Sequence, residues 1–232
     1  MRFALAALAL CTVLACSSSP STSFPGAGPG SNGSGGGDDG GPGTGPGSDA
    51  GSLDPGAYPP GPYGSAPGFT LNHFTAQGYR LGPGQTDSTR LPWVTIDTDE
   101  YHQSPVCKCL VVTVGATWCG DCQAEQPMLT QEHAQDPSFC VLGILQADIG
   151  PSGNQQNATK ADVDAWTQQF KQNFYVVQGT AVTMQDLVVG HGQGSVALPF
   201  SLVVRPDTMK VVGEVAGVNL QVHDYAMGLC NQ

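Results

Sequence analysis

Two long runs of apolar, often β-branched residues dominate the hydrophobic pattern in the C-terminal half of the chain. Residues 106–115 (VCKCLVVTVG) and 139–148 (FCVLGILQAD) lack polar–apolar alternation. Such runs predict strands that are buried on both faces, as in parallel sheets. Two shorter runs, 201–205 and 211–215, flank a turn-forming segment at 205–210 and predict a pair of strands. The pattern favours an α/β domain.

Helical periodicity separates these strands. Residues 123–135 and 161–174 are rich in helix formers, and each segment offers apolar residues for one face. Residues 183–190 predict a short helix and residues 219–229 a closing helix, whereas 150–157 predicts a polar loop. The residues expected to face the core are Ala124, Met128 and Leu129 in the first helix and Val163, Trp166 and Phe170 in the second.

The N-terminal third has a different composition. The 232-residue chain contains 32 Gly and 18 Pro, and residues 17–68 hold 17 of the Gly and 10 of the Pro. A segment this poor in apolar residues cannot bury enough surface to offset the entropy of ordering. We therefore predict a flexible tether over residues 16–62 and one folded domain over residues 63–232, which is long enough for a sizeable core.

The first residues indicate export. A short positive start is followed by an apolar run at 3–10, as in a secretory signal peptide, and the run is too short to span a bilayer. Val13-Leu14-Ala15 before Cys16 resembles a bacterial lipobox, which implies a signal peptide over residues 1–15 and a lipid on Cys16. Ser17 follows that cysteine, and the resemblance to lipoprotein sorting in Gram-negative bacteria then implies the outer membrane, facing the periplasm. The alternative is an ordinary signal peptide that happens to be followed by a cysteine.

Charge excludes some partners. The formal net charge is −11 and the sequence pI is about 4.5. No basic stripe is available to neutralise phosphates, so nucleic acid is not expected as a partner. The acidic balance also disfavours attraction to anionic lipid, so the only membrane contact we expect is through a lipidated Cys16.

The strand at 106–115 runs directly into Trp118-Cys119-Gly120-Asp121-Cys122, at the start of a predicted helix. Two cysteines three residues apart at a helix start lie on one side, close enough to form a disulfide. The unpaired N–H groups and the positive end of the helix dipole stabilise a thiolate on Cys119. Cys119 would attack a disulfide and Cys122 would resolve the mixed intermediate. The negative charge of Asp121 opposes the thiolate and indicates a more reducing couple.

These residues resemble the thioredoxin superfamily, and within it the membrane-tethered TlpA/ResA-like thiol-disulfide oxidoreductases. Ala124-x-x-Pro127 with Glu125 is similar to the pattern that follows the dithiol in this family, although Gln123 replaces the usual base. The segment 66–71 (APGFTL) resembles the start of these domains, and 197–200 (ALPF) resembles their cis-proline segment. The resemblance covers residues 64–230.

The resemblance implies a thioredoxin-like fold, with a mixed central sheet flanked by helices and an N-terminal β extension. It also implies an enzyme that exchanges disulfides with extracytoplasmic protein thiols or disulfides through Cys119 and Cys122 and depends on a separate redox partner. Trp118, Leu198 and Pro199 would form the client contact surface. No bound cofactor is required, because the dithiol is the redox group. Many members use a buried acid; Glu125 is a candidate by adjacency alone, and we expect it to be an ordinary first-turn helix acid.

Four other cysteines remain in the predicted domain. In the expected fold, the strand that contains Cys109 runs parallel to the strand that starts at Cys140, far from the catalytic end. We therefore predict two structural disulfides, with Cys107 and Cys109 each joining either Cys140 or Cys230. The alternative is a second redox pair formed by Cys107 and Cys109.

Two other functions remain open. No second pair of cysteines or spaced histidines accompanies the dithiol, so no metal site is predicted, and Gln123 stands where haem attachment needs histidine. Two thiolates alone could still hold Cu(I) in a metallochaperone. The domain could also be a binding module that kept the fold without turnover.

Overall fold

The structure is a computed structural model. It describes residues 57–146, 157–180, 187, 197–219 and 221–232. The predicted signal peptide, Cys16 and nearly all of the predicted tether lie outside these residues, as do most of the predicted helix at 183–190 and of the loop at 150–157.

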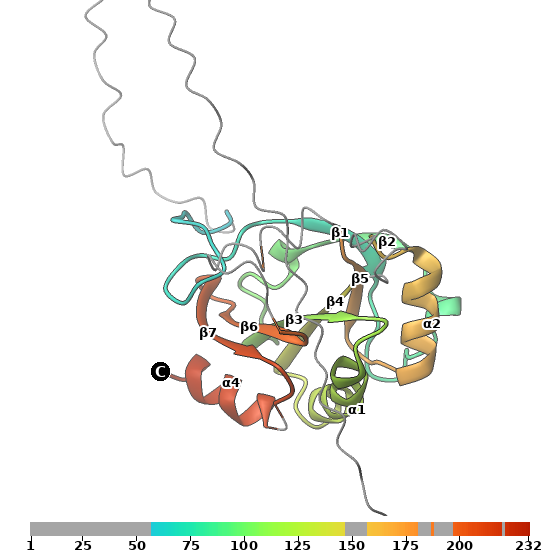
Figure 1. The fold of residues 1–232 in the computed structure, drawn as a ribbon. Coiled ribbons are helices and arrows are strands. Elements are labelled where there is room, and N and C mark those ends of the chain that lie inside the picture. Colours follow the sequence, from blue (N-terminus) through green and yellow to red (C-terminus); the bar gives the residue numbers. More distant parts are fainter. Residues whose placement is uncertain (1–56, 147–156, 181–186, 188–196, 220) are drawn as a thin grey trace, which may run out of the picture.

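One sheet of seven strands organises the domain, in the order β2-β1-β5-β4-β3-β6-β7 (Figure 1). The sheet is mixed, because β3, β4 and β5 are parallel while β6, β7, β1 and β2 join antiparallel. The strands are β1 Thr75–Tyr79, β2 Val94–Asp97, β3 Cys109–Ala116, β4 Phe139–Gln146, β5 Tyr175–Gln178, β6 Phe200–Arg205 and β7 Lys210–Ala216.

The central strand β3 is buried along its whole length, which is why its sequence is continuously apolar. It pairs with β4 in parallel over eight positions, from Cys109 opposite Phe139 to Ala116 opposite Gln146. The predicted parallel neighbours are therefore confirmed. The strand begins three residues later than predicted, at Cys109, and ends directly before the dithiol segment.

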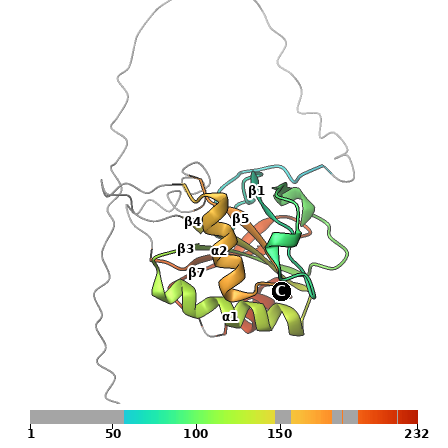
Figure 2. The ribbon, with the colours of Figure 1, turned by 90° about the vertical axis from the view of Figure 1, so that its right-hand side faces the viewer.

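Three helices cover one face of the sheet: α1 (Gly120–Gln135), α2 (Lys160–Phe170) and α4 (Val222–Cys230). Figures 1 and 2 show α1 and α2 next to each other on this side, and residues of all three helices share one hydrophobic core with β3. A capping box between Thr159 and Asp162 starts α2. The helix ends before Lys171, which has a φ of 52°, and so stops short of the predicted end at residue 174.

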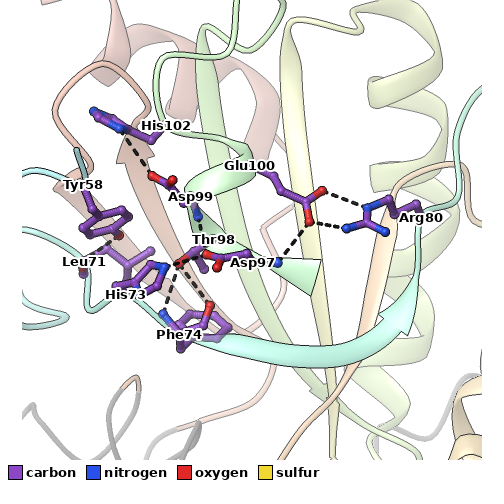
Figure 3. Close-up of polar contacts among 10 residues, drawn as sticks. All are labelled: Tyr58, Leu71, His73, Phe74, Arg80, Asp97, Thr98, Asp99, Glu100 and His102. Atoms are coloured by element: carbon purple, nitrogen blue, oxygen red, sulfur yellow. Dashed lines mark hydrogen bonds and ion pairs between the residues drawn. The ribbon is translucent and has the colours of Figure 1, made fainter. Parts of the chain in front are cut away.

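The N-terminal part of the domain packs on the opposite face. Leu71 and Tyr101 belong to a second core that includes Leu110 and Val112 of β3. Figure 3 shows Tyr58 lying against this part of the domain, where its hydroxyl donates to the Leu71 carbonyl over 2.9 Å. Its ring is tilted against His73, with the ring centroids 4.9 Å apart. Tyr58 thus contacts the domain, although it falls within the predicted tether.

Two short strands add an N-terminal β extension. β1 and β2 form an antiparallel pair that continues the sheet because β1 also pairs with β5, with Gly78 opposite Val177. The 3-10 helices η1 (Ser88–Arg90) and η2 (Thr98–Glu100) flank β2. The strands β4-β3-β6-β7 with helices α1 and α4 form a thioredoxin-like fold, as the resemblance implied.

Candidate active site

The two cysteines of the dithiol sit where β3 meets α1. Cys119 is the N-cap of α1, and Cys122 lies in the first turn. In the oxidised form described here they are joined by a disulfide, with Cα atoms 5.2 Å apart. The backbone N–H of Cys122 donates to the Cys119 sulfur over 3.0 Å. After reduction, this donor and the helix dipole would stabilise a thiolate at Cys119.

Burial distinguishes the two sulfurs. The Cys119 residue is 5% exposed and Cys122 is fully buried. Of the two residues, only Cys119 has any surface open to solvent. Gly120 and Asp121 between them are exposed, so the negative charge of Asp121 faces solvent next to the dithiol.

Gly115 at the end of β3 lets Cys122 pack directly on the strand. A Cβ atom at this position would come within 3.3 Å of the Cys122 Cβ and 3.7 Å of its sulfur. Trp166 of α2 closes the same space, at 4.0 Å from that position. Trp166 is 5% exposed and belongs to the core, as predicted.

The inward face of α1 differs from the sequence prediction. Ala124 is exposed, and the buried residues are Cys122, Glu125, Gln126 and Leu129. These positions follow the i, i+3, i+4, i+7 spacing of one helix face. Two of the four buried residues, Glu125 and Gln126, are polar. The apolar periodicity therefore selected the wrong face, apart from Leu129.

The structure also corrects the expectation that Glu125 is an ordinary first-turn helix acid. Glu125 lies in the second turn of α1 and is only 1% exposed, so it is not a solvent-facing first-turn acid. Burial raises the pKa of its carboxyl to about 7, and the nearby Glu132 charge adds to this effect. The Thr113 hydroxyl, 3.5 Å from Glu125 Oε2, and the Asn219 backbone N–H act in the opposite direction.

Polar side chains continue behind Glu125. Gln126 donates to the Cys122 carbonyl over 3.2 Å, and Gln172 in turn donates to Gln126. Both glutamines are buried. A cavity of about 10 Å³, lined in part by Gln126, Gly115 and Trp166, is at the lower limit for one water molecule. Sequence reasoning missed Gln126 and Gln172; the spacing of Gln126 from Cys122 and Leu129 is the one signal for it.

The predicted client-contact residues lie at the same end of the sheet. The Leu198–Pro199 peptide bond is cis, and Pro199 leads into β6, where Phe200 pairs with Val114. This register brings the segment level with the C-terminal end of β3, the end from which the dithiol segment follows. Leu198 and Trp118 are partly buried and pack on the core. Val218, two residues after β7, is 37% exposed, and the N–H of its neighbour Gly217 donates to the Pro199 carbonyl. Val218 was not among the predicted contact residues.

The four other cysteines lie at the opposite end of β3. Cys107 is joined to Cys140, with Cα atoms 5.6 Å apart, and Cys109 to Cys230, with Cα atoms 5.7 Å apart. This is one of the two predicted arrangements, and Cys107 and Cys109 are not joined to each other. Along β3, a rise of about 3.3 Å per residue separates the two ends by roughly 23 Å.

Within the described residues, no group of three or more histidine, cysteine, aspartate or glutamate side chains could hold a metal ion. No helix in the same residues is long and apolar enough to cross a membrane.

No family model matches this sequence, and no curated protein matches it. Several solved structures are similar. The thioredoxin domain of a thiol-disulfide oxidoreductase from Bacteroides vulgatus is 14% identical with a TM-score of 0.49, over 71% of this chain and 98% of that one. A secreted thiol-disulfide isomerase from Corynebacterium glutamicum is 14% identical with a TM-score of 0.49, over 71% and 87%. A thiol:disulfide interchange protein from Bacteroides sp. is 16% identical with a TM-score of 0.48, over 72% and 91%.

Proposed function

We propose that the chain is an extracytoplasmic thiol-disulfide oxidoreductase that exchanges disulfides with protein clients through Cys119 and Cys122. The observation that carries the proposal is the cap of α1. The sulfur of Cys119, a residue that is 5% exposed, accepts the N–H of Cys122 at the positive end of a 16-residue helix. A thiolate at this position is stabilised and can be reached, which is what a nucleophilic cysteine requires.

In the reducing direction, the Cys119 thiolate attacks one sulfur of a client disulfide. The other client sulfur leaves as a thiolate, and a mixed disulfide forms. Cys122 then loses its proton and attacks the Cys119 sulfur, which releases the second client sulfur. The client disulfide gains two electrons, and the dithiol is oxidised to the disulfide seen here.

Glu125 is the group proposed to take the proton from Cys122. It lies three residues further along the same buried face of α1, where side chains at this spacing are neighbours. With its pKa raised by burial to about 7, the carboxylate can accept a proton near neutral pH and return it.

Two further features bear on the direction of electron transfer and on how clients bind. The exposed charge of Asp121 disfavours thiolates beside it, which supports a reducing couple. Trp118, Leu198 and Pro199 would receive an extended client segment at the end of β3. A separate thiol protein would have to restore the dithiol after each cycle.

The proposed location is the bacterial cell envelope. Three disulfides among the described residues suit an oxidising compartment. A lipid on Cys16 would anchor the chain, with the outer membrane, facing the periplasm, as the favoured site, and the Gly- and Pro-rich segment would hold the domain away from the lipid.

A redox titration of the full chain tests the function. The fraction of Cys119 alkylated would be followed by mass spectrometry across defined dithiothreitol and glutathione ratios. A midpoint near or below about −220 mV supports a reductase, and one near about −120 mV would instead indicate an oxidant. A Cys119–Cys122 pair that stays oxidised or stays reduced at every ratio would overturn the exchange mechanism. If the pair stays reduced, stoichiometric Cu(I) binding that is lost on Cys122→Ser would favour a metallochaperone.

A further inference from the structure

The two disulfides at the far end of β3 differ in their surroundings. Cys109 is fully buried in the core beneath α4, and the contact of its sulfur with the Ala226 carbonyl is buried. Cys107 is 6% exposed, but its partner Cys140 reaches the surface, where its sulfur lies 3.9 Å from the Pro137 carbonyl oxygen. Cys230, the partner of Cys109, is half-buried, and the contact of its sulfur with the Val204 carbonyl is partly buried. An external thiol can therefore reach the Cys140 sulfur more readily than either sulfur of the Cys109–Cys230 pair.

The fold does not depend on both disulfides to the same degree. Cys107–Cys140 ties the segment just before β3 to β4. The two strands already pair along eight positions, and Leu110 lies directly opposite Cys140. Cys109–Cys230 instead ties the sheet to the last helix, across a sequence separation of 121 residues. If the Cys107–Cys140 bond opened, the strand ladder would still hold the two segments together.

Cys140 also lines a surface groove of about 490 Å³. Val106, which is 58% exposed, and Pro137 also line this groove, which extends to Tyr175. The ion pair between Arg80 and Glu100, drawn in Figure 3, forms part of its polar lining. The groove thus offers space next to an accessible sulfur for residues that flank an incoming thiol.

The leaving side of the bond has positive charge nearby. Cys107 and Cys230 both line a separate pocket of about 340 Å³, together with Lys108 and Arg205 and with the opposite charge of Asp207. Positive groups near a sulfur stabilise its thiolate. Attack at Cys140 would therefore expel Cys107 towards this basic pocket.

We propose that Cys107–Cys140 is a second thiol-exchange site, which accepts electrons from a protein dithiol at the far end of the sheet from Cys119. A thiolate of the partner attacks the Cys140 sulfur, and Cys107 leaves as a thiolate. The second partner thiol then attacks the partner sulfur of the mixed disulfide and releases Cys140. The partner dithiol is oxidised to a disulfide, and its two protons and two electrons pass to Cys107 and Cys140.

The test uses the full chain with Cys119→Ser and Cys122→Ser, so that the proposed active site cannot contribute. The protein is incubated with reduced glutathione under native conditions, and free thiols are alkylated and located by mass spectrometry. The Cys109–Cys230 pair in the same molecule is the matched control. We expect Cys107 and Cys140 to become labelled at least about tenfold faster than Cys109 and Cys230, because exchange depends on access to the sulfur. The glutathione adduct should form on Cys140, not on Cys107.

Equal labelling rates for the two pairs would overturn the proposal, as would an adduct confined to Cys107 or reduction that occurs only with loss of near-UV circular dichroism. If the double variant does not fold, the same rates are measured at these four cysteines in the wild-type chain. Titration of Cys119 is a separate readout, so failure here leaves the proposed function intact, and failure there leaves this site testable.

Discussion

Cysteines in disulfides lie at both ends of β3, but their surroundings differ between the two ends. At the C-terminal end, Cys119 caps a helix and its sulfur accepts a backbone N–H. At the N-terminal end, Cys107 and Cys109 precede or begin the strand itself, where no helix starts. Sulfur reactivity depends on access and on the stabilisation of the thiolate, and only the first end has a helix dipole for this purpose.

The comparison shows that cysteine content alone does not locate a redox site. All three disulfides have similar Cα separations, from 5.2 to 5.7 Å. What differs is the element on which each sulfur lies and the way in which it meets solvent.

The largest effect is expected at the helix cap. Cys119→Ser removes the nucleophile, so reduction of insulin by the reduced full chain should fall to the uncatalysed rate. Cys122→Ser should instead accumulate a mixed disulfide on Cys119, because the resolving thiol is gone. The double variant Cys109→Ser/Cys230→Ser is the control at the other end of β3 and should keep its activity at temperatures where it is folded. Turnover that survives Cys119→Ser would place the active dithiol elsewhere.

Removal of either disulfide at the N-terminal end of β3 should lower the free energy of unfolding. Loop-closure entropy predicts a loss of about 5 kcal/mol in the free energy of unfolding for Cys109→Ser/Cys230→Ser and about 4 kcal/mol for Cys107→Ser/Cys140→Ser, from sequence separations of 121 and 33 residues. Urea denaturation of both double variants measures the difference. A larger loss for Cys107→Ser/Cys140→Ser would contradict the view that the β3–β4 ladder makes this bond less necessary.

The sequence predicted the dithiol end of the domain well, because that end is built from local signals. A continuous apolar run must be buried, and the cysteine pair follows it where helix formers begin. The short strand β5 and the pair β1–β2 were not located, since four or five residues without strong alternation give little signal. Their pairing depends on partners far away in sequence.

Glu125 shows why the site was predicted only in part. Apolar periodicity placed Ala124, Met128 and Leu129 on the inner face of α1, but the packing against β3 instead buries Glu125 and Gln126. A buried carboxyl is compensated by tertiary partners, here Thr113 and the Asn219 backbone. No local pattern specifies such partners, so the sequence could not reveal the burial.

Glu125→Gln tests the proton acceptor. In the wild type, the rate at which Cys122 resolves the mixed disulfide should rise with pH through about 7, as the carboxylate forms. In the variant, this rise near pH 7 should be absent. Rapid-quench measurement of the mixed disulfide between pH 5.5 and 8.5 gives the rate. A rise near pH 7 that persists in the variant would assign the proton transfer to another group.

The same variant has a stability signature with a definite sign. Because the folded-state pKa of Glu125 is raised, the folded protein holds this proton more tightly than the unfolded chain. Wild-type stability should therefore fall as pH rises from about 4.5 to about 7, by about 3 kcal/mol for this group. Glu125→Gln should remove that loss, so its advantage over the wild type should be larger at pH 8 than at pH 4.5 in urea denaturation. An equal difference at both pH values would contradict the raised pKa.

The smallest expected effect concerns the contact between β3 and the resolving cysteine. In Gly115→Ala, the new methyl group would meet the Cys122 Cβ at 3.3 Å, so Cys122 or the strand must shift by a few tenths of an ångström. We expect a loss of about 1–3 kcal/mol in stability, as for other overpacked cores, and slower resolution of the mixed disulfide. Gly228→Ala in α4 is the matched control, because nothing lies within 4 Å of its Cβ position. Alanine is the better helix former there, so this control should be stabilised by up to about 1 kcal/mol. If Gly115→Ala resembles Gly228→Ala in both stability and kinetics, close packing of Cys122 on β3 is not what positions the resolving sulfur.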